Sequence, residues 1–459
     1  MLKIITLMVS CMMMVSCTST NYTPKQPIHI PQNWHHKDSH FVPTKKENTV
    51  CFAWWRQFND PVFEALITQS LVSNNDLQIA MANIEAAQGE LKRVELNWIP
   101  GAGTMLGYSS FPYLGYPGVL AAVVPTYTIN LISQFYEQKR AKYELSMTES
   151  VRDSVKLAVI AELSANYFSY LAQRDKLSLL RQIESDEQEI IAIYEAAFHN
   201  GLFNNVDVEK LKSKLELMRS EEKVLRHSLV IHQNAIRFLL NDNPGPLVNK
   251  GEYSQLNNQH LVVGALPLNV IENRPDVKQA NDALRASNAG VNIAVSGFLP
   301  TIQLSMARGD IATVPNGRKL GQPVYFNQAL LQTPLVTLST FGEIDKAKGL
   351  NKASYFHYQN TLRQALREVD DDLSAHDYFS ERFSHTQKAE AHLYDAYRLN
   401  QSLYQKGVIS YATLLQEKIK LYTLKMKLNQ HKLDQLLSVV HLYQDLAVGY
   451  GCSNIPSSM

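Results

Sequence analysis

Two long stretches of the chain have apolar residues at alternating spacings of three and four. Each stretch also lacks proline, the strongest helix breaker, because none occurs from 126 to 243 or from 335 to 455. Such spacing is typical of a coiled-coil seam, and each stretch is therefore predicted to form long helices. The spacing is clearest near the C-terminus, at Leu433, Leu436, Val440, Tyr443 and Ala447.

A glycine near the middle of each stretch, Gly201 in the first and Gly407 in the second, predicts a turn. Each stretch then consists of two long helices folded back on each other. The arm before the first turn, from about Phe135 to Phe198, would be on the order of 90 Å long at the α-helical rise. An ordinary globular domain does not accommodate a helix of that length.

Short segments between the helices alternate apolar and polar residues with a period of two. Thr126 to Leu131 and Thr301 to Met306 both show this pattern, which predicts strands with one apolar and one polar face. Gly101 to Gly118 and Gly309 to Pro323 are rich in turn-forming residues and are predicted as loops. A strand between lipid and water has this alternation, and so does a half-buried strand of a soluble sandwich.

The sequence contains an internal tandem duplication. A first set of matching positions differs by 200: Asp76 and Asp276, Ala80 and Ala280, Ala86 and Ala286, Trp98 and Phe298, Pro100 and Pro300. A second set differs by 206: Phe135 and Phe341, Glu137 and Glu343, Ala141 and Ala347, Phe198 and Tyr404, Gly201 and Gly407. Two constant offsets predict a first repeat at 54–250, a second at 251–450 and a C-terminal tail at 451–459.

The duplication gives two strands per repeat and four per chain. Four strands cannot close a membrane barrel, since the smallest known barrels have about eight strands. A membrane interpretation therefore requires an oligomer, and three chains would supply twelve strands.

The N-terminus has the layout of an export signal. One lysine precedes an uncharged apolar run from Ile4 to Val15, which is typical of a secretory signal peptide. The run ends at Met14-Val15-Ser16-Cys17, which resembles a bacterial lipobox. We expect residues 1–16 to be removed, Cys17 to carry lipid and 17–53 to form a linker; an ordinary signal with an incidental cysteine is the alternative.

Three cysteines follow the signal. If Cys17 is lipidated, Cys51 and Cys452 form an even pair in an oxidising compartment, and both a disulfide and two unpaired thiols remain open. In the linker, His35 and His36 are predicted to be solvated rather than metal ligands, because no cysteine or carboxylate lies nearby at ligand spacing.

Composition and motifs speak against nucleic-acid binding and against an enzyme. With 44 basic and 43 acidic residues the net charge is +1, so no field attracts nucleic acid. No metalloprotease, hydrolase or P-loop motif occurs, and no metal or cofactor is expected. The run Asp370 to Asp372 is predicted to be a solvated helix face, and Arg274, Pro275 and Asp276 to be a structural helix start.

Several ordered motifs resemble the outer membrane factor family, in particular TolC-like lipoproteins that serve efflux pumps of the resistance-nodulation-division type. They are WWRQFNDP from Trp54, the pair NNDLQIA and NRPDVKQA, FLPTIQLS, and KGVISYATLLQEKIKLYTLKMKLNQHKL. The resemblance runs from about Trp54 to Tyr450. It implies an α+β membrane protein: a homotrimer with a twelve-stranded outer-membrane β-barrel continued by a long α-helical coiled-coil tunnel in the periplasm.

The same resemblance implies partners and a gate. The partners would be a periplasmic adaptor and an inner-membrane pump, with a lipid anchor in the outer membrane. Asp207 and Tyr404 match residues that the family pairs across neighbouring hairpins to close the tunnel. An arginine of some members is replaced here by Ile409, and two constriction aspartates by Thr413 and Gln416, which implies a less charged constriction.

The favoured function is therefore the exit duct of a tripartite efflux system. Two alternatives remain at this point: the outer membrane channel of a type I protein secretion system, and a lipid-anchored periplasmic coiled-coil adaptor. An adaptor also has a long helical hairpin but does not need two copies with strand pairs between them.

Overall fold

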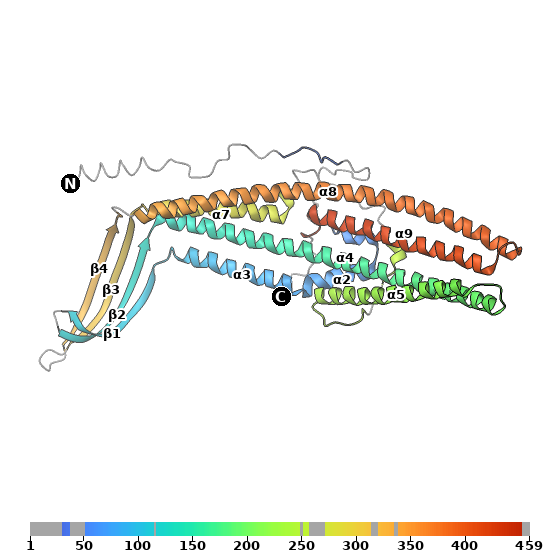
Figure 1. Ribbon diagram of the computed structural model, residues 1–459. Helices are drawn as coiled ribbons and strands as arrows, with labels where there is room; N and C mark the ends of the chain where they lie inside the picture. Colours follow the sequence, from blue (N-terminus) through green and yellow to red (C-terminus); the bar gives the residue numbers. More distant parts are fainter. Residues whose placement is uncertain are drawn as a thin grey trace. The chain divides into compact units, whose positions relative to one another are not determined.

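Long helices and two pairs of strands alternate along the chain (Figure 1). The computed structural model describes residues 30–36, 51–113, 116–247, 251–256, 271–313, 320–334 and 338–451. The predicted signal peptide, Cys17 and Cys452 lie outside these residues, as does most of the predicted linker.

The same order of elements occurs twice. The first series is α3 (Asn75–Leu96), β1 (Gly101–Tyr113), β2 (Tyr116–Ile129), α4 (Leu131–His199) and α5 (Asn205–Leu239). The second series is α7 (Pro275–Ser296), β3 (Thr301–Thr313), β4 (Leu320–Gln332), α8 (Leu338–Gln405) and α9 (Tyr411–Asp445). Corresponding helices have 22 and 22, 69 and 68, and 35 and 35 residues. Before the first series come η2 (Trp54–Phe58) and α2 (Pro61–Ser73), and η3 (Tyr253–Gln255) lies between the two.

The chain divides into two compact units, and each takes segments from both series. The first unit includes 82–150 and 278–361, and the second includes 51–81, 151–247 and 362–451 among its described residues. The strands belong to the first unit, and α2, α5 and α9 belong to the second.

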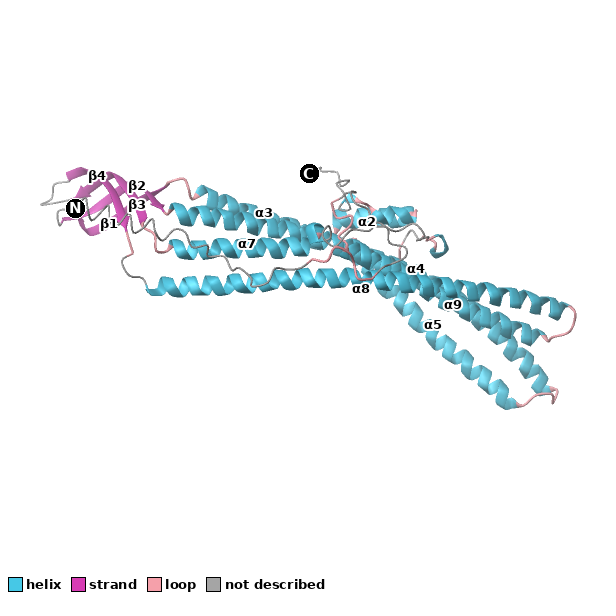
Figure 2. Cartoon of the chain, turned by 90° about the horizontal axis from the view of Figure 1, so that it is seen from above, coloured by secondary structure: helices cyan, strands magenta, loops and turns pink. Residues whose placement is uncertain are grey.

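The four strands of the first unit form one antiparallel sheet in the order β1-β2-β3-β4 (Figure 1). Figure 2 colours these strands magenta and the helices cyan. Gly101 pairs with Thr126, Thr126 with Ser305, and Ser305 with Gln328, so the register continues across all four strands. A strand of 13 residues is roughly 43 Å long, enough to cross a bilayer core of about 30 Å when tilted by about 45°.

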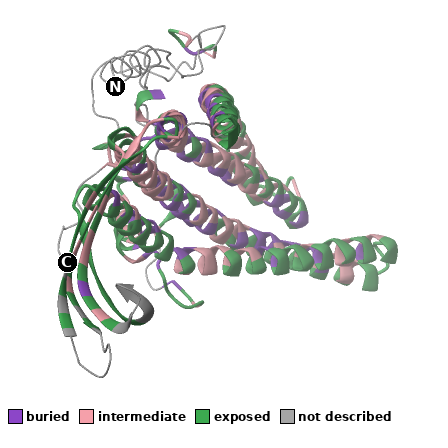
Figure 3. Cartoon of the chain, turned by 90° about the vertical axis from the view of Figure 1, so that its left-hand side faces the viewer, coloured by how far each residue is buried: buried purple, intermediate pink, exposed green. Residues whose placement is uncertain are grey.

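The sheet is mostly exposed in a single chain (Figure 3). Its large exposed side chains include Leu106, Tyr325 and Leu331, at 77%, 73% and 68%. In the described part of the chain β1 and β4 have no strand on their outer edges. Unpaired edges of this length require a further partner, and other copies of the chain can supply it.

Two details of the predicted strands were wrong. The segments predicted as loops, Gly101 to Gly118 and Gly309 to Pro323, largely belong to strands, because backbone hydrogen bonds build the ladder whatever the side chains are. At Gly309 a side chain would collide with the backbone of β2, so the glycine permits close pairing. The strand predicted at 126–131 ends at Ile129, because Asn130 accepts the backbone N–H of Ser133 at 3.1 Å and starts α4.

In the second unit, an aromatic core ties the chain's opening motif to its last helix. Trp54 stacks on Tyr443 of α9 with ring centroids 5.2 Å apart, and Phe63 stacks on Tyr167 of α4 at the same distance. Asp60 caps α2 by accepting the N–H groups of Val62 and Phe63, and it also accepts the Tyr167 hydroxyl at 2.6 Å. The WWRQFNDP motif is therefore a packing and capping device.

None of the described helices is both long and apolar enough to cross a membrane.

Candidate functional site

The two helical hairpins end in turns of the same design. Gly201 and Gly407 have φ values of +74° and +73°, the left-handed conformation that glycine adopts without strain. In each turn the glycine N–H donates to a carbonyl three residues back, and the next N–H donates to one five residues back, all at 2.9 Å. This pattern is a Schellman C-cap, so both turns lie where the glycines predicted them.

The side chains of Asp207 and Tyr404 have local partners. Asp207 lies in the first turn of α5, where Lys210 Nζ approaches its Oδ1 to 3.2 Å. Tyr404 lies in the last turn of α8, and its ring centroid is 5.3 Å from that of Tyr411. Asp207 is partly exposed and Tyr404 is exposed, so both are accessible to a neighbouring hairpin.

The first two turns of α9 carry the other two predicted tip residues. Thr413 Oγ1 lies 2.8 Å from the hydroxyl of Ser410, whose oxygen also accepts the Thr413 N–H and caps α9. Thr413 and Gln416 are exposed, and Ile409 beside the turn is partly buried. No formal charge is present at these three positions, so the tip of this hairpin lacks a ring of carboxylates.

Exposed apolar side chains, which the sequence-based predictions missed, also lie at the turns. Leu202 is 76% exposed and Val408, its counterpart 206 residues later, is 65% exposed. Phe203 is exposed as well, although its ring lies 4.6 Å from that of Tyr194. Their positions directly after the two turn glycines were the only available signal.

Each hairpin is held together by ion pairs between its own two arms. In the first hairpin, Lys214 of α5 lies 2.8 Å from Glu187 of α4, which is buried. In the second, Arg382 of α8 lies 3.2 Å from Asp434 of α9.

A further set of contacts joins the two hairpins. Lys418 of α9 lies 2.8 Å from Asp186 of α4, and Asn429 of α9 donates to Asp175 of α4 at 2.8 Å. An apolar cluster of Ile183, Ile190, Leu415 and Ile419 flanks the Lys418–Asp186 pair on both sides along the two helices. The α4–α9 seam, defined by these residues, therefore connects the hairpins. Sequence reasoning missed it, because Asp186 and Lys418 are 232 residues apart.

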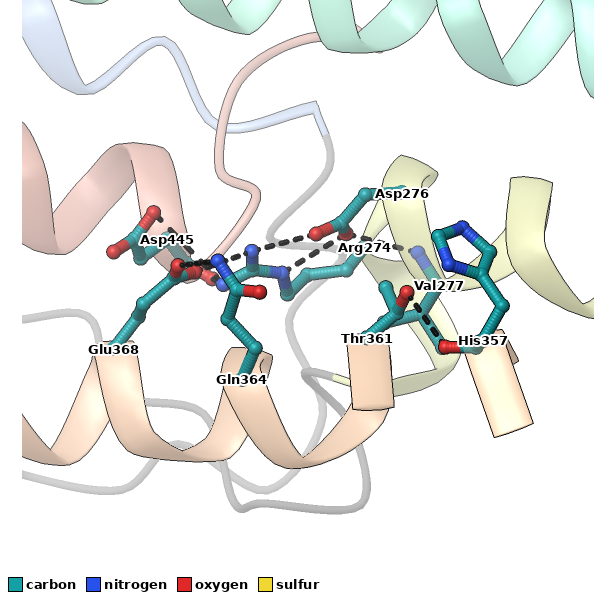
Figure 4. A network of polar contacts seen from close by, with 8 residues as sticks. All are labelled: Arg274, Asp276, Val277, His357, Thr361, Gln364, Glu368 and Asp445. Carbon is teal, nitrogen blue, oxygen red and sulfur yellow. Dashed lines mark hydrogen bonds and ion pairs between the residues drawn. The ribbon is translucent and has the colours of Figure 1, made fainter. Parts of the chain in front are cut away.

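A buried charge network surrounds the start of α7 in the second unit (Figure 4). Arg274, 8% exposed, donates to both carboxylate oxygens of Asp276 at 3.0 and 2.7 Å and to Glu368 at 2.8 Å. It also donates to the backbone carbonyl of Asp445, whose carboxylate lies 3.8 Å away. The structural role predicted for Arg274 and Asp276 agrees with these contacts, which join α7, α8 and the end of α9.

The network includes a carboxyl pair. Burial, together with the neighbouring charge of Asp445 and a hydrogen bond to it, raises the pKa of Asp372 to about 8. Burial also raises the pKa of Asp445, although the Arg274 charge opposes this. Because Arg274 favours the ionised form of Asp445, the shared proton belongs on Asp372. The prediction that the Asp370 to Asp372 run is a solvated face was therefore wrong for Asp372.

The linker histidines are not fully solvated either. The backbone N–H groups of His35 and His36 donate to one oxygen of Asp370 at 2.8 and 2.9 Å. The His36 ring lies 3.4 Å from Asp377, and its side chain is 21% exposed. Trp34, 8% exposed, belongs to the aromatic core and holds this segment in place.

The structure also bears on the predictions for metal binding and for the cysteines. Among the described residues, no group of three or more His, Cys, Asp or Glu side chains could hold a metal ion. Cys51 Sγ donates to the carbonyl of Gly451 at 3.2 Å, next to Cys452 in the sequence. The choice between a Cys51–Cys452 disulfide and two unpaired thiols involves Cys452, which lies outside the described residues.

A four-stranded sheet together with two long helical hairpins is the fold of solved outer membrane channels. The MtrE outer membrane channel of Neisseria gonorrhoeae, solved in its open state, has a similar fold with a TM-score of 0.80. The alignment covers 94% of this chain and 99% of that one at 20% identity. The predicted fold class is confirmed.

The sequence comparisons narrow the class. The profile of the outer membrane efflux protein family matches residues 66–242 and 266–448, and the chain belongs to that family. It is 25% identical to the solvent efflux pump outer membrane protein SrpC of Pseudomonas putida, over 86% of this chain and 87% of that one. It is 23% identical to the cation efflux system protein CusC of Escherichia coli O6:H1, over 87% and 88%. The chain is an outer membrane efflux channel, and the adaptor alternative does not hold.

Proposed function

We propose that this channel is the exit duct of a tripartite pump and that the two hairpin tips dock a periplasmic adaptor. The observation that carries the proposal is the exposed apolar pair Leu202 and Val408, one at each turn. Exposed apolar side chains gathered at the end of a helical hairpin are typical of a protein–protein contact. The relatives SrpC and CusC are named as components of an efflux pump and of a cation efflux system, which supports a role in such a pump. An inner-membrane pump would complete the assembly and select the cargo.

Charging the tips tests adaptor docking. We expect the Leu202→Glu, Val408→Glu variant to lose most efflux, because two carboxylates at the contact would have to be desolvated. The measurement is toxic-solvent or antibiotic resistance in a host whose own efflux duct is deleted, with the cognate adaptor and pump co-expressed. Val72→Glu, at a side chain of α2 that is 52% exposed, serves as the control and should keep resistance. Full resistance in the tip variant would contradict adaptor docking at the tips, and secretion of a protein substrate instead would favour the type I alternative.

We further propose that Asp207 and Tyr404 form the closing hydrogen bond of the resting tip, between neighbouring hairpins. Their accessibility and their positions beside the two turns support this role. We expect the Asp207→Ala, Tyr404→Phe variant to conduct several times more current at rest in a planar lipid bilayer. Glu209→Ala is the matched control, since Glu209 also pairs with a lysine three residues on but, two residues after Asp207, lies on a different face of α5. An unchanged resting conductance in the double variant would refute the closing bond.

We propose that Cys17 is lipidated and anchors the mature chain in the outer membrane. The lipobox-like Met14-Val15-Ser16-Cys17 supports it. Metabolic labelling with a palmitate analogue should label the wild-type chain and fail to label Cys17→Ser, whereas Cys51→Ser should be labelled normally. Equal labelling of wild type and Cys17→Ser would exclude this anchor.

A further inference from the structure

The helices of the second unit pack in an order that leaves one seam between the hairpins. Polar contacts link α5 to α4, α4 to α9, and α9 to α8. The first and last of these links lie inside a single hairpin. Among these links, only the α4–α9 seam joins one hairpin to the other, so a movement of the hairpins relative to each other within one chain must act on it.

The ion pair of this seam is buried. Asp186 is 6% exposed, and its Oδ1 lies 2.8 Å from Lys418 Nζ. Its second oxygen, Oδ2, is buried without a hydrogen-bond partner in the described part of the chain. Separating Lys418 from Asp186 would thus leave a carboxylate with little compensation in a low-dielectric setting, which is costly.

The surroundings reinforce the pair on both sides along α9. The Lys418 ammonium also lies 5.4 Å from the centroid of the Tyr422 ring. Closer to the turn, Tyr411 of α9 hydrogen-bonds Glu189 of α4. The tip itself carries uncharged residues at Ile409, Thr413 and Gln416. The Lys418–Asp186 ion pair between the hairpins therefore lies farther from the turns than these uncharged tip residues do.

We propose that Asp186 and Lys418 form a clasp that holds the two hairpins of each chain together and keeps the tunnel closed at rest. This inference rests on the proposed closure of the resting tip, to which it adds Asp186 and Lys418 as positioning residues. In this proposal, opening separates the two hairpins. The clasp opposes the separation because the ion pair must break.

The chain contains a matched control for this proposal. Glu187 follows Asp186 directly, is also buried, and pairs with Lys214 at the same distance of 2.8 Å. The Glu187–Lys214 pair, however, lies within the first hairpin. Removing either pair takes one ion pair with a buried carboxylate from α4, but only Asp186–Lys418 bridges the two hairpins.

The test compares two double variants that remove both charges of a pair, Asp186→Asn, Lys418→Met and Glu187→Gln, Lys214→Met. In planar lipid bilayers the first should raise the ratio of open to closed time roughly tenfold, the effect of a loss near 1.4 kcal/mol on a two-state equilibrium. The second should leave that ratio near the wild-type value. Equal opening in both variants, or in neither, would overturn the clasp.

A distance measurement tests the clasp independently of channel conductance. Spin labels at Leu202→Cys and Val408→Cys, with Cys51 and Cys452 replaced by serine, report the separation of the two tips. The Asp186→Asn, Lys418→Met change should lengthen or broaden that distance, and Lys418→Arg should not. A longer distance in a protein that conducts no current would keep the clasp and refute the channel gate, whereas an unchanged distance would refute the clasp itself.

Discussion

Replacing Arg274 with methionine is expected to destabilise the folded chain by about 3–5 kcal/mol, because it leaves three partly buried carboxylates without their buried cation. Arg274 makes charge-assisted hydrogen bonds to Asp276 and Glu368 and lies near the Asp445 carboxylate. Burial by itself lowers the pKa of Arg274, but these hydrogen bonds and charges prevail and raise it above its usual value. The arginine therefore stays charged and joins three helices.

The measurement is the thermal unfolding midpoint of the purified protein by circular dichroism, and the control is Arg56→Met. Arg56 also makes a short ion pair, with Glu64 at 2.7 Å, but both side chains are substantially exposed, at 54% and 41%. Such a pair contributes less than about 1 kcal/mol. Equal shifts for the two variants would show that the Arg274 network does not stabilise the fold.

Asp372 is expected to make the stability of the protein depend on pH. Its pKa in the folded chain is about 8, above the ordinary value of 3.8, so the folded state binds a proton more tightly than the unfolded state. The resulting stabilisation is fully present below the ordinary pKa and is lost as the pH rises through the folded value. Between these limits the slope approaches about 1.4 kcal/mol per pH unit at most.

The Asp372→Asn variant should remove much of that dependence, because an amide can donate to Asp445 at every pH. The groups around the pair include Arg274, Glu368, Asp371 and His441. Unfolding midpoints of the two proteins should agree near the ordinary pKa of 3.8 and diverge progressively up to about pH 8, with the wild type lower. Asp371→Asn, at the exposed neighbour, should follow the wild type. Parallel curves for wild type and Asp372→Asn would rule out a proton held at this site.

The long helices and their turns could be predicted from the sequence because their signals are local. Spacing in α9 and the left-handed glycines at 201 and 407 act within a few residues. The strand at 301–306 was found for the same reason. The strand at 101–113 was not, because its glycine-rich sequence has no period of two and its stability comes from backbone pairing with β2.

The contacts that join distant segments could not be predicted. Nothing near Lys418 indicates that its partner is Asp186, and nothing near Asp372 indicates that Asp445 shares its proton. Such pairs are fixed by how the helices pack, which a single sequence does not reveal without the fold. The resemblance to a family supplied Asp207, Tyr404, Thr413 and Gln416, and the structure places all four beside the two turns.

The central claim is that three copies of this chain join their four-stranded sheets into one barrel. The sheet has unpaired outer strands, β1 and β4, in the described chain. Native mass spectrometry of the protein extracted from the outer membrane measures the number of chains directly. The account predicts an assembly of three chains, and a stable monomer, dimer or tetramer would contradict it.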